Sequence, residues 1–337
     1  MQASDTAATP RSDILDRGED MEKERGLGRL ARRPSEIPTR GWWAVLRRVF
    51  REAGSDNLPM SAASCAFFAL LALFPALSVL ISLYGLAFDP VSVEGQLKAV
   101  RDFVPPAAFD LITGRVHDLV TTNSSQLGWR LAFSVALALW SASAATKAMM
   151  TALNVSYEEK EKRGFLVFNA VALLFTLCGI LGMSLALSII VGLPAVLQLA
   201  WLGPLADLAL RLVSWGLLAG FLILGLGVMY RWGPSRSQAR WRWITPGSVA
   251  VAVVWIAASV LFSFYVTNFT SYDVTYGSLG AVVAAMMWLY ISAYVVLLGA
   301  ELNAELELQT RQDTTSGRPR PMGERGAFVA DHVAEAT

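Results

Sequence analysis

Two charged side chains lie inside long apolar stretches of the sequence, where ionisable groups are costly and mark sites of pairing or function. Lys147 lies in the stretch LWSASAATKAMMTAL, residues 139–153, and Glu301 lies near the end of the last apolar stretch. Equal depth and opposite charge predict an ion pair between them. The alternative is that each side chain reaches head groups or water by itself, which costs little near the end of a span. In a transport path, Glu301 would be the candidate carrier of a proton or cation.

Five further residues are candidates for a structural or transport role. Asn169 and Asn303 are amides within apolar surroundings, where they are expected to hydrogen-bond between helices. Pro75 lies in the middle of the first apolar stretch and predicts a kink, which is either a hinge or a fixed shape. Asp273 and Tyr276 belong to the short polar stretch SYDVTYGSLG. They predict a gate or a solute contact, or else a tight turn with tyrosines at the membrane interface.

The composition indicates which elements must position these residues. Of 337 residues, 54% are hydrophobic and only 16% are charged, which is typical of a membrane protein. Apolar runs of about twenty residues are long enough to cross a bilayer as helices. We therefore predict an all-α integral membrane protein with a six-helix transmembrane bundle. Its spans are expected at about 61–86, 129–153, 165–193, 207–230, 245–267 and 279–303.

Lysine and arginine are distributed unevenly between the links, which predicts the orientation. They are frequent before the first span, after the second and fourth spans, and after the sixth. The links at 194–206 and 268–278 contain none. We therefore expect a multi-pass protein of the bacterial cytoplasmic (inner) membrane with both termini in the cytoplasm.

The segments outside the spans complete the predicted organisation. Residues 1–38 and 308–337 are polar and charged, and both are predicted to be disordered cytoplasmic tails around a membrane domain at 39–307. The stretch RGWWAVLRRVFREAG, residues 40–54, predicts an amphipathic helix on the cytoplasmic side. It would bind anionic lipids of the inner leaflet, or pack as a soluble helix on the loops. Residues 88–128 predict an outer helical hairpin.

The inventory of reactive side chains argues against an enzyme. A zinc-dependent nuclease needs several clustered ligands, but the chain has two histidines, His117 and His332, which the predicted topology places on opposite sides of the membrane. Its two cysteines, Cys65 and Cys178, lie in separate apolar spans. The sequence contains no Walker-type glycine loop. We therefore expect no catalytic residues, no metal site, no cofactor and no nucleic-acid partner.

Four stretches together resemble the YihY/BrkB family of bacterial inner-membrane proteins. They are AASCAFFALLALFPALSVL (62–80), ALNVSYEEKEKRGF (152–165), RWGPSRSQARWRWITPGSVAVAVVW (231–255) and FTSYDVTYGSLGAVVAAMMWLYISAYVVLLGAELNAELE (269–307). The resemblance covers about 45–307. It implies six transmembrane helices and a role in transport or in the envelope, and it supplies no substrate. The older label of such proteins as ribonuclease BN has no counterpart in the reactive residues of this chain.

These observations predict a transporter, exporter or lipid translocator without its own ATPase. Its partners would be inner-leaflet lipids and a solute or lipid substrate, and a homo-oligomer is compatible with the sequence. The alternative is a non-transporting membrane scaffold for envelope assembly, and the third candidate is a ribonuclease. A transporter should enclose a polar cavity that reaches the middle of the membrane, whereas a scaffold should be packed solid.

Overall fold

The computed structural model describes residues 24, 26–87, 127–198, 204–269 and 278–334. Helices make up almost all of the regular structure in these residues. Ala239 and Thr315 form one isolated antiparallel β-bridge. The helices are α2 (Thr39–Ser55), α3 (Leu58–Ala87), α6 (Leu127–Ser156), α7 (Phe165–Gln198), α8 (Pro204–Trp232), α9 (Trp241–Phe269) and α11 (Ser278–Leu308), with a short 3-10 helix η1 (Pro34–Glu36) and a short helix α12 (Phe328–Asp331).

The long helices coincide with the stretches predicted as spans. Within the described residues, three stretches are long and apolar enough to cross a membrane: Phe165–Ala186, Trp241–Val266 and Val282–Leu308. A bent pair, Thr39–Ser55 with Leu58–Leu73, also passes as one broken span, and Gly216–Trp232 is a shorter apolar helix. The prediction of an α-helical protein with helices long and apolar enough to cross a membrane is confirmed. The full set of six crossings stays a prediction.

Large apolar side chains on the outside of α7 and α9 fit a surface that faces lipid. Leu166 is 80% exposed and Leu261 is 69% exposed. In water such side chains would be expected in a core, because their burial is favourable by about 1.5–3 kcal/mol each. In a bilayer they need no protein cover, so the bundle can be open on this side.

The sharpest bend in the first part of the chain lies between α2 and α3 rather than at Pro75. The axes of the two helices differ by 65°, and Asn57 between them has a φ of 51°. Asparagine tolerates this left-handed conformation better than most residues. Pro75 lies inside α3, which continues as a helix on both sides of it. A hinge at Pro75 therefore stays a prediction.

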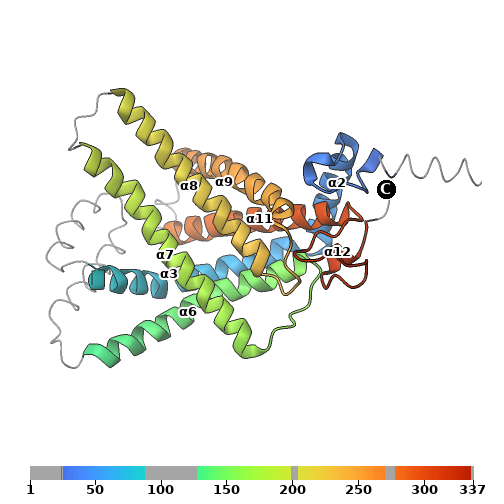
Figure 1. Cartoon of the computed structure of the whole chain (residues 1–337). Coiled ribbons are helices and arrows are strands. Elements are labelled where there is room, and N and C mark those ends of the chain that lie inside the picture. The colour runs from blue at the N-terminus through green and yellow to red at the C-terminus, as the bar shows by residue number, and fades with distance from the viewer. Residues whose placement is uncertain (1–23, 25, 88–126, 199–203, 270–277, 335–337) are drawn as a thin grey trace, which may run out of the picture.

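Helix α11 runs through the middle of the bundle and contacts α2, α3, α6, α9 and α12 (Figure 1). Its approach to α9 is close because two glycines face each other. A Cβ atom on Gly247 would collide with the carbonyl oxygen of Gly299, and a Cβ on Gly299 would collide with Val251. Small residues at such a crossing let the helix backbones approach, as they do in other membrane bundles.

Helix α2, the α6–α7 link, the α8–α9 link and the C-terminal segment meet at one end of the bundle, which we call the polar end (Figure 1). The backbone N–H of Ser235 donates to Asn154, and Ser235 Oγ accepts from the N–H of Lys162. The N–H of Arg240 donates to the carbonyl oxygen of Thr314. The links rich in lysine and arginine thus lie together, as predicted. That this end faces the cytoplasm stays a prediction.

The prediction of a disordered C-terminal tail is wrong for residues 309–334. Several of their side chains are buried, among them Gln309, Thr314 and Arg325 at 0%, 0% and 5% exposure. The polar composition indicated disorder because it lacks large apolar residues. Here hydrogen bonds to the rest of the polar end replace an apolar core. Residues 26–38 of the other tail are also packed, with Arg29 and Ile37 at 4% and 5% exposure.

Candidate functional site

The last two turns of α11 carry polar side chains that are all buried. Along the run ELNAELELQ, every second residue from Glu301 to Gln309 is polar, and none is more than 3% exposed. Residues two apart on a helix point in nearly opposite directions. Their side chains therefore need partners on several sides of α11, and α2, α9 and the C-terminal segment supply most of them.

Arg48 of α2 supplies one of these partners. Its guanidinium forms an ion pair with Glu305 and donates to Gln309 Oε1 at 2.7 Å. Both partners of the ion pair have side chains only 4% exposed. Arg48 belongs to the stretch predicted as an amphipathic helix, and its side chain is buried against α11. The arginine turns inward because α2 packs on α11 through this face.

The outward face of α2 carries Trp43 and Phe50, which are 74% and 72% exposed. Val45 and Val49 on the inward face are buried. The face of α2 with Val45 and Val49 packs on the bundle, and the opposite face with Trp43 and Phe50 is exposed. The insertion of Trp43 and Phe50 into the inner leaflet stays a prediction.

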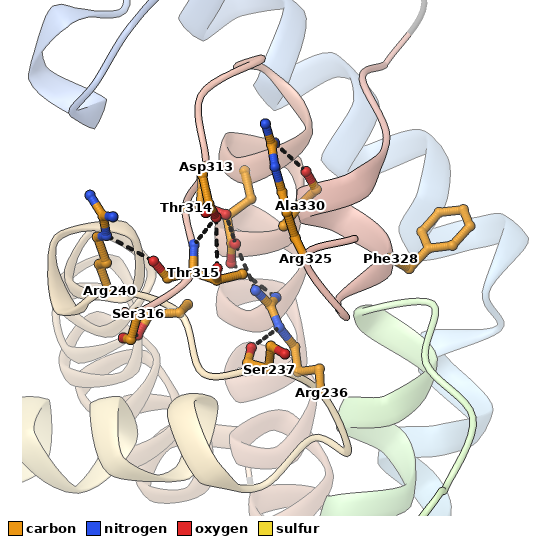
Figure 2. A network of polar contacts seen from close by, with 12 residues as sticks. Arg236, Ser237, Arg240, Asp313, Thr314, Thr315, Ser316, Arg325, Phe328 and Ala330 are labelled. Carbon is orange, nitrogen blue, oxygen red and sulfur yellow. Dashed lines mark hydrogen bonds and ion pairs between the residues drawn. The ribbon is translucent and has the colours of Figure 1, made fainter. Parts of the chain in front are cut away.

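A second buried ion pair joins α11 to the α8–α9 link (Figure 2). Arg236 Nη1 and Nη2 donate to the two carboxylate oxygens of Glu307 at 3.0 and 2.7 Å. Thr314 Oγ1 of the C-terminal segment donates to the same carboxylate at 2.5 Å. The Arg236 guanidinium lies 4.9 Å from the centre of the Tyr157 ring. Burial alone would lower the pKa of Arg236, but the Glu307 carboxylate raises it above its ordinary value, so the arginine stays charged.

Asn154 at the end of α6 ties two links together. Its Oδ1 accepts from the N–H of Ser235 at 2.7 Å, and its Nδ2 donates to Glu161 Oε2 at 3.0 Å. Glu161 also accepts from Nε and Nη2 of Arg163 at 2.7 and 2.8 Å. These hydrogen bonds, chiefly those from Arg163, lower the pKa of Glu161 to about 2. These hydrogen bonds therefore hold the α6–α7 link in one conformation against the α8–α9 link.

The C-terminal segment is closed by Arg325 and by its contact with Glu159. Arg325 donates to the carbonyl oxygens of Ala330 at 2.6 Å and Arg311 at 2.9 Å, and Figure 2 shows it directed at Ala330. The N–H of Phe328, at the start of α12, donates to Glu159 Oε1 at 2.7 Å. One arginine thus satisfies carbonyls from both sides of the loop and fixes it over the polar end.

The predicted ion pair between Lys147 and Glu301 is not formed. Lys147 Nζ donates to Asn169 Oδ1 of α7 at 3.3 Å and lies 4.6 Å from the centre of the Trp140 ring. Lys147 therefore faces α7, whereas Glu301 faces the side of α11 where acidic residues of α2 and of the α6–α7 link lie. Position in the sequence predicts only the depth of a residue along its helix, whereas the rotation of each helix about its axis decides which residues meet.

Glu301 is 3% exposed, and its Oε2 atom is buried with no hydrogen-bond partner among the described residues. The charged groups that act on it electrostatically include Asp56 and Glu305, both acidic. The described residues contain no group of three or more histidine, cysteine, aspartate or glutamate side chains that fits a metal ion. Glu301 is thus a buried carboxyl group in an apolar stretch without a cation beside it.

The other predicted site residues have separate surroundings. Asn303 Oδ1 accepts from the N–H of Gly247 at 2.8 Å and joins α9 to α11. Asn169 accepts from Lys147 and donates to the carbonyl oxygen of Phe165 at 2.8 Å. The contacts with Gly247 and Lys147 join two helices, whereas the hydrogen bond to Phe165 lies within α7. Asp273 and Tyr276 lie outside the described residues.

The sequence analysis missed the residues that form the two buried ion pairs. Arg48 and Arg236 were counted only as positive charges for the orientation, and Glu305 and Glu307 were not singled out. The available signal was the run of polar residues at every second position, three of them glutamates, at the end of an apolar stretch. Two of these glutamates have arginine partners, Arg48 of α2 and Arg236 of the α8–α9 link.

An open groove lies beside this network, between α7 and α8. It has a volume of about 670 Å³ and ends at the α8–α9 link. We call it the α7–α8 groove. A smaller polar cavity of about 170 Å³ shares Ser237 and Gln238 with it and is lined by Arg320 and Arg325. Both lie at the polar end.

Comparisons with known proteins agree on the kind of protein. A family model described as "Virulence factor BrkB" matches residues 49–323. The chain is 32% identical over 268 residues to a ribonuclease-like protein, YfkH, of Bacillus subtilis (strain 168), which covers 78% of this chain and 95% of that protein. It is 25% identical over 280 residues to the UPF0761 membrane protein PSHAa0171 of Pseudoalteromonas translucida (strain TAC 125), covering 81% of this chain and 88% of that protein. No solved structure matches the chain.

Proposed function

Because the chain belongs to the virulence factor BrkB family of membrane proteins, we propose that it is a translocator that moves a solute or a lipid across the bacterial cytoplasmic membrane. It works without an ATPase of its own. The polar end faces the cytoplasm, in keeping with its lysine-rich and arginine-rich links. Trp43 and Phe50 of α2 rest in the inner leaflet among anionic lipids.

The observation that carries the proposal is the Glu301 carboxyl group. Within the last turns of α11, Glu305 and Glu307 have arginine partners, but Glu301 has none in the part of the chain that the structure describes. Burying an ionisable group in an apolar stretch costs free energy. Such groups mark ion and proton paths in transporters. Glu301 binds and releases a proton or a cation during the transport cycle.

Complementation of a deletion strain tests this role. The strain receives the wild-type chain, Glu301→Gln, or the control Glu324→Gln, which removes an exposed carboxyl group of the C-terminal segment. Comparative lipidomics and metabolomics identify the molecules that change in the deletion strain. We expect the wild type and the control to restore their distribution, and Glu301→Gln to reach the membrane at normal abundance without restoring it. Full restoration by Glu301→Gln would remove the assigned role.

A scaffold for envelope assembly is the second candidate, and the buried ion pairs favour it. Arg48–Glu305 and Arg236–Glu307 fasten α2 and the α8–α9 link to α11, which suits a rigid body that presents a fixed surface. A scaffold predicts an envelope defect in the deletion strain with no change in any solute or lipid across the membrane. It also predicts that Glu301→Gln complements fully.

The name of the Bacillus relative raises a third candidate, a ribonuclease, which we propose does not apply to this chain. The two histidines, His117 and His332, are too few for a zinc-dependent nuclease. Purified protein with added zinc is expected to leave tRNA precursors intact. Cleavage that persists through stringent purification and is lost in His117→Ala would establish the opposite.

A further inference from the structure

The α7–α8 groove combines apolar walls with a charged end. Its walls include Val171, Leu174 and Phe175 of α7 and Val228 of α8, and its end is formed by the α6–α7 and α8–α9 links. A volume of about 670 Å³ lies within the range of sites that hold small molecules. A ligand that fits would have an apolar part and a polar head directed at the polar end.

The cations at the end of the groove differ in whether a carboxylate already pairs with them. Four cations line it, and three are already neutralised: Lys162 by Glu159, Arg163 by Glu161 and Arg236 by Glu307, each at 2.7 Å. Arg231 has no carboxylate within ion-pair distance in the part of the chain that the structure describes. The net charge available to a ligand is therefore that of Arg231.

The Arg231 side chain is held in place by neutral groups. It donates to the carbonyl oxygen of Ala239 and to Ser316 Oγ, the latter at 3.1 Å. Its guanidinium carbon lies 5.1 and 5.3 Å from the ring centres of Trp232 and Trp241. Its Nε atom is buried and has no hydrogen-bond partner among the described residues. The accessible part of the guanidinium is Nη2, whose contacts with Gln238 and Ser316 are exposed, and a fixed cation without a carboxylate partner among the described residues is suited to bind an anion there.

The surroundings favour a lipid over a soluble anion. Trp232 and Trp241 are 38% and 41% exposed, and tryptophans gather at the level of lipid head groups. Further along, α7 and α8 close together, since a Cβ on Gly182 would collide with the ring of Phe221. The groove thus opens toward the head-group level and narrows toward the membrane interior. A free anion would not use the apolar walls between these points.

We propose that the α7–α8 groove binds one anionic phospholipid, with its phosphate at Arg231 and the upper part of an acyl chain along Val171, Leu174 and Phe175. This inference deepens the proposed function and rests on it for one point, that the bound lipid represents the translocated class. The binding site itself stands on the geometry of the groove.

Cys178 reports on occupancy without a change to the sequence. It lines the groove and is exposed, whereas the other cysteine, Cys65, is buried. The full-length protein in mixed micelles is labelled with a maleimide, and modification of each cysteine is read by peptide mass spectrometry. The probes are phosphatidylglycerol, phosphatidylcholine with the same acyl chains, and inorganic phosphate. Because Cys65 is buried, it should stay unlabelled as long as the fold is intact, and its labelling would report unfolding.

Phosphatidylglycerol is expected to slow the labelling of Cys178 about tenfold at a concentration ten times its Kd. Phosphatidylcholine is expected to protect weakly and inorganic phosphate not at all. Arg231→Gln should raise the phosphatidylglycerol concentration for half protection by about tenfold, the effect of losing one charge-assisted contact. Arg231→Lys should keep part of the protection. The matched control is Arg318→Gln, which removes the same charge from an exposed site at the polar end.

Three results would overturn the site. They are protection of Cys178 by phosphatidylcholine equal to that by phosphatidylglycerol, protection of Cys178 by inorganic phosphate alone, and unchanged protection by phosphatidylglycerol in Arg231→Gln. The proposed function fails in a different way. If Glu301→Gln and the wild type complement equally while phosphatidylglycerol still protects Cys178, the groove is a lipid site of a protein that does not use Glu301 for transport.

Discussion

Glu307 of α11 and Arg236 of the α8–α9 link form a two-point ion pair in which the side chains are 0% and 2% exposed. Thr314 donates a further hydrogen bond to the carboxylate (Figure 2). One carboxyl group therefore fixes the α8–α9 link, 71 residues away in the sequence, and the C-terminal segment that follows α11.

Removal of one partner of this pair should be strongly destabilising. Arg236→Met leaves Glu307 buried without a cation, and the expected loss of stability is about 3–5 kcal/mol. The double variant Arg236→Met with Glu307→Leu should recover much of it, because no buried charge remains. Thermal unfolding of the purified protein measures both. As a control, Arg51→Met breaks an exposed pair with Glu52 and should cost about 0–1 kcal/mol. Equal losses in Arg236→Met and Arg51→Met would contradict the buried pairing.

A double-mutant cycle distinguishes the partner of Lys147. Lys147→Met and Asn169→Leu should be coupled by about 0.5–1.5 kcal/mol, since they share a hydrogen bond between α6 and α7. Lys147→Met and Glu301→Gln should be additive to within about 0.5 kcal/mol. Unfolding in increasing SDS provides the free energies. Coupling to Glu301 instead of Asn169 would restore the ion pair that the sequence suggested.

Glu161 should make the free energy of unfolding fall as the pH is lowered. The hydrogen bonds from Arg163 lower its pKa to about 2 from an ordinary value of 4.5. Because the folded-state pKa is depressed, the stabilisation is complete above pH 4.5 and is lost as the pH falls toward 2. Glu161→Gln should therefore reduce the unfolding temperature at pH 6 and narrow its difference from the wild type as the pH approaches 3.

The exposed Glu324→Gln is the control for the loss of one carboxyl group. A difference between Glu161→Gln and the wild type that stays constant from pH 6 to pH 3 would show that Glu161 does not titrate as the structure indicates. Other acids contribute to the slope equally in both proteins, so the difference isolates Glu161.

Cysteine labelling in intact cells tests the orientation. In a variant without Cys65 and Cys178, a cysteine at Arg318 of the polar end should react only after the membrane is permeabilised. A cysteine at Ser124, which lies outside the described residues, is expected on the outer side from the distribution of lysine and arginine. It should react with a membrane-impermeant maleimide in intact cells. The reverse pattern would invert the orientation and place the polar end outside.

The sequence by itself determined the helices and the polar character of one end of the bundle. Helix formation in an apolar run is a local requirement, because each backbone N–H in lipid must bond within its own segment. The long helices α7, α9 and α11 therefore begin and end close to the predicted positions. Lysine and arginine in the links are equally local, and the links that carry them do meet at one end.

The tertiary structure alone decided the partners of the charged residues. The rotation of α6 and α11 directs Lys147 to Asn169 and leaves Glu301 without a cation among the described residues. Hydropathy fixes the length of a helix and carries no information about its rotation, which depends on packing against every neighbour. For the same reason a polar C-terminal segment predicted to be disordered is ordered here, since Arg325 and Thr314 find their partners only once the bundle has formed.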